Sequence, residues 1–425
     1  MEKITADTLG TFLFNRTNFE ARKLSPDNRE GFSLRLISSL LGQTGQLDQL
    51  PPVLHVAGTN GKGSVCFFLE QGLASRGLTT GTFLSPHVER INERIRLNGR
   101  PVEDAALFRA ADRLRSRNLP DLHSATTFEI LFLLAIEIFI NKKVEYCIFE
   151  TGLGGRLDTT NILSPKAVLI SPISLDHTAI LGTTLKEIAL EKAGIIKPGV
   201  PCFLSAQQPV AAQILLNRCQ SLNSDSVRAD TLPFSVASKG IHGFEYSSEY
   251  GEFHCRMPGS HQAANLHLAL CALHYLKLKP NISRLSTLLA SENLPARMEY
   301  LPGTPAYLLD GGHNPAAAEV LVELLQGYPD KKVFLAAIQE DKDYTSYLRT
   351  LHRLEGYFIF TTTGVSRSAA PELLRTAFQR AGEAIQDSAA ALQKARETAG
   401  TRGIVVICGS FYLCGSLRQS VRNWQ

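Results

Sequence analysis

The chain has 425 residues, of which 44% are hydrophobic and 20% charged, and its formal net charge is +4. This length suits two domains better than one hydrophobic core, and the composition is that of a soluble globular protein. The small net charge argues against a nucleic-acid partner, and no apolar run resembles a secretory signal or is long enough to span a membrane.

Apolar runs of strand length alternate with helix-length segments along the first part of the chain. The expected strands are residues 53–57, 81–84, 144–149, 167–173 and 201–204. They are apolar at almost every position, which is typical of parallel strands buried on both faces. The expected helices are residues 64–76, 103–117 and 127–141. Together these elements predict an α/β fold with a mostly parallel sheet covered by helices.

Residues 232–257 break this alternation and predict a small antiparallel section, followed by helices at residues 261–276 and 282–291. Residues 293–304 are rich in Pro and Gly, so we place a domain boundary there, between a domain at 1–295 and a smaller one at 296–425. Strands expected at residues 306–309, 332–337, 357–361 and 404–408 make the second domain a Rossmann-like α/β unit.

Arg90, Arg94, Arg96 and Arg100 lie close together in the sequence, with two glutamates among them. This mixture of charges indicates a solvated face or a site for a small anion. It is too weak to predict binding of nucleic acid.

The eight cysteines are scattered and form no CxxC pair. Cys147 and Cys408 lie inside apolar runs, where cysteine behaves as a small buried hydrophobe. This usage predicts a reducing, cytoplasmic location, with neither a disulfide framework nor a zinc site.

The strongest local signal is the glycine-rich turn that follows the expected strand at residues 53–57. Glycines let the backbone approach a phosphate closely, and the N-terminus of the next helix favours its negative charge. A turn that ends in Lys62 and Ser64 therefore predicts ATP binding, with Lys62 reaching the β and γ phosphates. The spacing departs from the strict Walker pattern, since Gly63 separates Lys62 from Ser64. The loop consists of Gly58, Thr59, Asn60, Gly61, Lys62, Gly63 and Ser64.

This loop resembles the phosphate loop of the Mur ligase superfamily, in its folylpolyglutamate synthase/dihydrofolate synthase branch. Further stretches agree with that branch in the same order, and the resemblance covers nearly the whole chain. These stretches are residues 85–87 (SPH), 150–161 (ETGLGGRLDTTN), 175–177 (LDH), 191–194 (EKAG) and 310–315 (DGGHNP).

The resemblance implies a magnesium site made of Ser85, Glu150 and His177. Glu150 closes one apolar strand and His177 follows another, so both can face the crevice at the carboxyl ends of a parallel sheet. Without the resemblance, Ser85 would be interpreted as an ordinary turn residue, Glu150 as a solvated carboxylate at a strand end, and His177 as a structural histidine. The resemblance also implies that Lys192 is carbamylated and helps to hold a second magnesium ion, although a solvated lysine is the ordinary interpretation.

The remaining site residues also follow from the resemblance. Four match adenosine-side positions: Asn265, Arg297, Asp310 and His313. Four match positions for the pterin-bearing substrate: Thr126, Leu157, Asp158 and Thr159. Residues 32–35 depart from the branch, because the usual segment there is one residue longer.

The implied activity is an ATP-dependent ligase that adds L-glutamate to a folate-type carboxylate through an acyl phosphate. The sequence leaves open whether the acceptor is dihydropteroate, a reduced folate such as tetrahydrofolate, or both, and Thr126 and Asp158 favour both. Lys62, His177 and Lys192 are expected in the catalytic machinery. A Mur-type ligase for another acid and a nucleotide-binding regulatory module without catalysis are the alternatives. We expect a monomer that acts on small molecules, without nucleic-acid or membrane partners.

Overall fold

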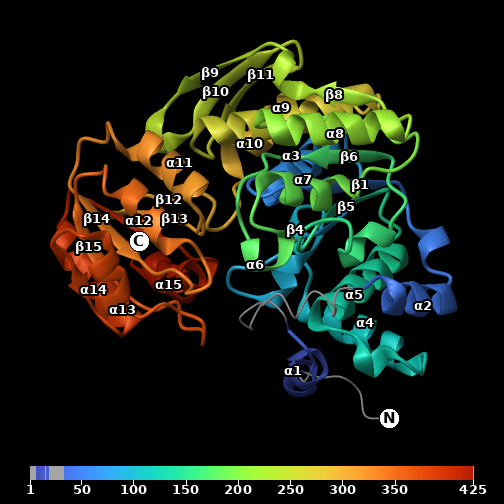
Figure 1. Cartoon of the computed structure of the whole chain (residues 1–425), viewed down its shortest axis with the longest axis horizontal. Coiled ribbons are helices and arrows are strands. Elements are labelled where there is room, and N and C mark those ends of the chain that lie inside the picture. The colour runs from blue at the N-terminus through green and yellow to red at the C-terminus, as the bar shows by residue number, and fades with distance from the viewer. Residues whose placement is uncertain (1–5, 15, 19–32, 425) are drawn as a thin grey trace. The chain divides into compact units, whose positions relative to one another are not determined.

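The computed structural model describes residues 6–14, 16–18 and 33–424, which divide into two compact units (Figure 1). The first unit runs to Pro233 and includes Ala264–Leu285, whereas the second contains Phe234–Ala263 and the chain from Ser286 onward. The division between residues 295 and 296 remains our proposal for the boundary of the two α/β domains. Residue 32 of the departing segment lies outside the described residues.

Within the described part of the chain, the first unit contains an eight-stranded sheet in the order β4-β3-β2-β5-β1-β6-β7-β8. From β2 to β8 the neighbouring strands are parallel, which confirms the predicted mostly parallel sheet. The strands are β1 (Val53–Ala57), β2 (Thr80–Phe83), β3 (Ile95–Leu97), β4 (Arg100–Pro101), β5 (Tyr146–Glu150), β6 (Ala167–Ile170), β7 (Cys202–Leu204) and β8 (Ser226–Arg228).

The helices of the first unit flank this sheet (Figure 1). α5 is buried along nearly its whole length, including Glu137, because its sequence is apolar at most positions on every side. No helix in the described ranges is both long and apolar enough to cross a membrane. The helices are α1 (Ala6–Phe14), α2 (Arg35–Thr44), α3 (Lys62–Ser75), α4 (Asp104–Ser116), α5 (Thr127–Lys142), α6 (Thr178–Leu181), α7 (Leu185–Ala193) and α8 (Pro209–Ser221), with α9 (Ser260–Tyr275) and α10 (Ile282–Ser291) crossing between the units.

The sequence predicts a solvated face or a small-anion site around Arg90, Arg94, Arg96 and Arg100. The solvated face is wrong for Arg94 and Arg96, because both are buried. Arg96 is buried and donates to Glu70 Oε2 from both Nε (3.2 Å) and Nη2 (3.1 Å). Arg94 is also buried and donates to His87 Nδ1 at 2.8 Å. These partners satisfy the two guanidinium groups inside the fold, where an unpaired charge would be costly.

The second unit contains a three-stranded antiparallel sheet, which confirms the antiparallel section expected at residues 232–257, and a larger six-stranded sheet. The larger sheet has the order β12-β13-β17-β14-β15-β16 among the described residues, and only its edge strand β12 is antiparallel. The strands are β9 (Phe234–Ser238), β10 (Phe244–Ser248), β11 (Gly251–Cys255), β12 (Glu299–Leu301), β13 (Ala306–Asp310), β14 (Lys332–Ala336), β15 (Tyr357–Phe360), β16 (Glu383–Ala384) and β17 (Ile404–Cys408).

The helices of the second unit complete a smaller α/β fold, as predicted. They are α11 (Pro315–Leu325), α12 (Tyr344–Leu351), α13 (Pro371–Phe378), α14 (Ser388–Ala399) and α15 (Phe411–Asn423). All eight cysteines of the chain are buried with free thiols, including Cys147 on β5 and Cys408 on β17.

Candidate active site

The loop after β1 is held tightly against the loop after β6. Gly58 has a φ of 146°, and a Cβ atom at this position would lie 1.9 Å from Ser171 Oγ, so only glycine fits. The backbone N–H groups of Thr59 and Asn60 both donate to Pro172 O, at 2.9 and 3.2 Å. Because these contacts join two strand ends, they fix the path of the phosphate loop.

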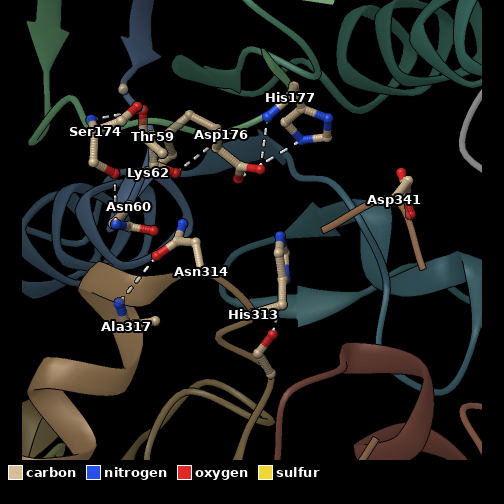
Figure 2. A network of polar contacts seen from close by, with 12 residues as sticks. Thr59, Asn60, Lys62, Ser174, Asp176, His177, His313, Asn314, Ala317 and Asp341 are labelled. Carbon is tan, nitrogen blue, oxygen red and sulfur yellow. Dashed lines mark hydrogen bonds and ion pairs between the residues drawn. The ribbon is translucent and has the colours of Figure 1, made fainter. Parts of the chain in front are cut away.

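Side chains of the same loop extend this contact to Ser174. Thr59 Oγ1 donates to Ser174 O at 3.1 Å, and Asn60 Nδ2 donates to Ser174 Oγ at 3.2 Å (Figure 2). The side chains of Thr59 and Asn60, in the predicted ATP loop, are therefore fixed by hydrogen bonds to Ser174.

α3 begins at Lys62, two residues earlier than expected, because Gly61 takes the left-handed conformation that caps it, with a φ of 86°. A Cβ atom on Gly61 would lie 2.6 Å from Asn265 Oδ1, so Asn265 of α9 packs directly on this glycine. Gly63 and Ser64 lie buried in the first turn of α3. The N-terminus of α3 therefore adjoins Asn265, whose role on the nucleoside side of ATP remains a prediction.

Three predicted residues meet at the carboxyl ends of β1, β5 and β2, which are neighbours in the sheet. Glu150, the last residue of β5, is 2% exposed, and its Oε2 accepts a hydrogen bond from Ser85 N at 3.0 Å. Its other oxygen, Oε1, lies 3.9 Å from Lys62 Nζ. A buried carboxylate is thus placed beside the lysine of the phosphate loop.

His177 follows β6 and has a φ of 49°, an unusual value for a residue with a side chain. Its N–H donates to Asp176 Oδ1 at 2.8 Å, and its Nε2 lies 3.8 Å from Asp176 Oδ2 (Figure 2). The sequence pattern assigns no role to Asp176, although it stands beside His177 in the motif at residues 175–177.

Lys192 is buried on α7, and its Nζ donates to Gly58 O at 2.6 Å. Burial, and after it the positive charge of Lys62, lower its pKa to about 7, although Asp176 and Asp158 act in the opposite direction. The ordinary interpretation of a solvated lysine is therefore wrong. A neutral amine is available here near neutral pH, which is uncommon for lysine.

These residues offer a donor set that suits magnesium. No three His, Cys, Asp or Glu side chains in the described ranges gather into a complete metal cage. Magnesium seldom needs such a cage, since one or two carboxylates, water and substrate phosphates complete its octahedron. The carboxylate of Glu150 and the hydroxyl of Ser85, next to a phosphate loop, fit that requirement.

Two of the expected pterin-side residues also shape the fold. Asp158 is buried, with Oδ2 accepting from Leu153 N at 2.8 Å and Oδ1 accepting from Thr160 N at 3.0 Å. Thr126 caps α5, since its Oγ1 accepts from Glu129 N at 3.2 Å. Leu157 and Thr159, on either side of Asp158, are half-buried. The role of these four residues in binding an acceptor remains a prediction.

In the second unit, two predicted residues, Arg297 and His313, contact the ring of Phe411. The Arg297 guanidinium lies 4.2 Å from the ring centroid, a cation–π contact. The His313 ring meets Phe411 edge to face at 6.2 Å, and its Nδ1 lies 3.1 Å from Gly311 O (Figure 2). The ring of Phe411, the first residue of α15, therefore supports the side chain of Arg297.

Asp310 ends β13, and its carboxylate accepts from Met298 N at 3.3 Å and from Gly312 N at 3.1 Å. Burial raises its pKa to about 6, although the charge of Arg297 and these hydrogen bonds act in the opposite direction. A buried carboxylate with this pKa is typical of a functional site.

The raised pKa of Asp310 predicts that the effect of Asp310→Asn on stability depends on pH. The folded protein binds a proton at Asp310 more tightly than the unfolded chain does, so the group's contribution to stability falls as pH rises from about 4 to about 6. The melting temperature of the parent minus that of the variant should therefore decrease by a few degrees across this window and then level off. Thermal unfolding of both proteins from pH 4.5 to 8 tests this. A difference that grows with pH would contradict it. Asp387→Asn, at the exposed start of α14, is the control.

Two protein-family models match this chain, one in each of its two parts. The Mur ligase middle domain matches residues 56–273, and the Mur ligase, glutamate ligase domain matches residues 296–411. The dihydrofolate synthase/folylpolyglutamate synthase of Bacillus subtilis (strain 168) is 31% identical over 91% of this chain and 94% of its own length.

Solved structures agree with this similarity. E. coli FolC in complex with DHPP and ADP has a TM-score of 0.86 and 27% identity, covering 98% of this chain and 97% of that one. The bifunctional folylpolyglutamate synthase/dihydrofolate synthase from Yersinia pestis, complexed with AMPPNP and Mn ion, has a TM-score of 0.84 and 27% identity, covering 98% of both chains.

Proposed function

This chain belongs to the Mur ligase family, among its dihydrofolate synthases/folylpolyglutamate synthases, and from that premise we propose which of its residues carry out the reaction. The enzyme is an ATP-dependent ligase that joins L-glutamate to the carboxylate of a folate-type acid. The observation that carries our assignment is the meeting of Lys62, Glu150 and Ser85 beside a glycine loop at adjacent strand ends.

The chemistry proceeds through an acyl phosphate. The acceptor carboxylate attacks the γ phosphorus of ATP, a new P–O bond forms, and ADP leaves. The amine of glutamate then attacks the activated carbonyl carbon, loses a proton, and expels inorganic phosphate as the amide forms. Because a carboxylate is a poor electrophile, phosphorylation supplies the leaving group, and the protein mainly aligns reactants and neutralises charge.

The first unit would bind the triphosphate. The backbone of residues 58–64 and the N-terminus of α3 surround the phosphates, and Lys62 neutralises the charge that moves from the γ phosphoryl group to the leaving ADP. Glu150, Ser85 and His177 would hold magnesium, which when bound spreads the phosphate charge. The family resemblance assigns Asn265, Arg297, Asp310 and His313 to the nucleoside side of ATP, and we keep that assignment as part of the proposal.

Lys62→Ala should lower kcat by about 100-fold or more, since it removes a charge that acts on the transferring phosphoryl group. Far-ultraviolet circular dichroism should remain that of the parent, because Lys62 Nζ supports no core packing. Lys186→Ala, an exposed lysine on α7, is the matched control and should keep the parent rate. Turnover of the Lys62 variant near the parent rate would remove the loop from the mechanism.

We propose further that Lys192 is carbamylated and that its added carboxylate helps to hold a second magnesium ion. The family resemblance suggests this modification, and the burial of Lys192 beside Gly58 and near Lys62 supports it. Only a neutral amine adds CO2, and a buried lysine with a pKa of about 7 supplies one near neutral pH. The resulting negative charge would offset the charge of Lys62.

Carbon-13 NMR in labelled bicarbonate tests the modification. The parent should show a carbamate resonance that Lys192→Ala lacks, and its intensity should increase as pH rises through about 7, where the amine loses its proton. Identical spectra for parent and variant would contradict the proposal.

We propose that the enzyme uses both dihydropteroate and tetrahydrofolate. The full-length similarity to a Bacillus subtilis enzyme named for both activities supports dual use. With ATP, magnesium and glutamate present, each acceptor should release phosphate and yield a glutamate-extended product in equal amounts. Phosphate release with only one acceptor would restrict the enzyme to that activity.

We also propose that the enzyme acts as a monomer in the cytoplasm. The assigned residues all come from one chain, and its eight free cysteines agree with a reducing compartment. Light scattering of the purified protein, with and without ADP, would reveal a larger assembly if one forms.

A further inference from the structure

The backbone on either side of Arg297 has an unusual conformation. Ala296 and Met298 have φ values of 52° and 51°, in the left-handed region that residues with side chains seldom occupy. Such a segment persists only where its surroundings hold it in place. The contacts that hold it therefore control where Arg297 lies.

Two buried carboxylates bind the N–H groups of these two left-handed residues. Ala296 N donates to Glu299 Oε2 at 3.0 Å, and Met298 N donates to Asp310 Oδ1 at 3.3 Å. The carbonyl of Ala296 also accepts from Gly311 N at 2.9 Å. Asp310 already belongs to the predicted nucleotide site, whereas Glu299 does not.

Glu299 is in turn held by α15. Arg418 Nε lies 2.8 Å from Glu299 Oε2 and its Nη2 lies 2.7 Å from Oε1, with both residues almost fully buried. Phe411, the ring beneath the Arg297 guanidinium, begins the same helix seven residues before Arg418. Seven residues span about two helical turns, so both side chains lie on one face of α15. One helix thus supports the side chain of Arg297 directly and its backbone through Glu299.

We propose that Glu299 and Arg418 are positioning residues for nucleotide binding, which act through Arg297. This inference rests on the nucleotide contact proposed for Arg297. The competing explanation is that the pair only fastens β12 to α15. Buried ion pairs add little net stability compared with apolar residues of similar volume. A pair that also binds the N–H group of a left-handed residue has a second task, which is to maintain one backbone conformation.

Arg418→Met tests the proposal by calorimetric titration with ADP. We expect ADP to bind about tenfold more weakly, because the variant removes the two short bonds that fix the carboxylate holding Ala296 N and leaves only the longer contact of Arg422 with Glu299, at 3.6 Å. In turnover assays the KM for ATP should rise more than kcat falls. Leu374→Ala, in the buried face of α13, is the control for general destabilisation and should leave ADP affinity within about twofold of the parent.

Arg297→Ala separates this inference from the proposed function. Unchanged ADP affinity in that variant would refute the nucleotide role of Arg297 itself. Weaker binding in Arg297→Ala together with parent affinity in Arg418→Met would refute only the positioning role. In the double variant, loss of Arg418 should add no further loss of affinity, because the side chain that it positions is gone.

Arg418→Lys provides the test if the methionine variant does not fold. Lysine keeps the charge but cannot form the two parallel bonds of a guanidinium. Its ADP affinity should lie between those of the parent and Arg297→Ala. Parent affinity in Arg418→Lys would then overturn the proposal.

Discussion

The close approach of the loop after β1 to the end of β6 determines the geometry of the phosphate site. Gly58 leaves no room for a side chain against Ser171, and the next two N–H groups donate to Pro172 O. Lys192 binds the carbonyl of Gly58 from α7. The loop therefore has one path, α3 starts at one place, and Lys62 lies beside Glu150 before any substrate arrives. Such preorganisation matters for phosphoryl transfer, in which alignment and charge neutralisation supply most of the catalysis.

Buried charge serves the same purpose in both units. Glu150 in the first unit, and Asp310 and Glu299 in the second, are almost fully removed from water, and each accepts a backbone hydrogen bond. Burying a carboxylate is unfavourable unless its partners compensate, and the raised pKa of Asp310 shows that compensation there is incomplete. A fold can retain such an unfavourable buried charge at a site where its fixed position favours ligand binding.

Local patterns predicted the sheet better than the contacts that hold the site. The run at residues 53–57 matches β1 because it is buried on both faces, and residues 404–408 match β17 for the same reason. The apolar pattern does not predict β3 and β4, because both are short and contain an arginine, and β4 lies at the sheet edge.

Distant contacts are harder still to predict. Glu299 and Arg418 are 119 residues apart, and no periodicity in the sequence connects them. The left-handed conformation of Ala296 was equally hidden, since neither alanine nor its neighbours signal it. The family motifs identified which residues gather at the phosphate loop. The packing adds contacts that the motifs do not contain: Asp176 binds His177 in the first unit, and Phe411 and Glu299 contact the segment of Arg297 in the second.

In the proposed mechanism, the acceptor carboxylate attacks ATP directly at the loop of Lys62. This attack is tested by supplying an acceptor whose carboxylate carries oxygen-18, with ATP, magnesium and glutamate, and by analysing the released phosphate by mass spectrometry. An acyl phosphate predicts that each phosphate released with product contains one labelled oxygen, because the bond formed at phosphorus is kept when the amide forms. Phosphate without label, alongside normal product, would contradict the account.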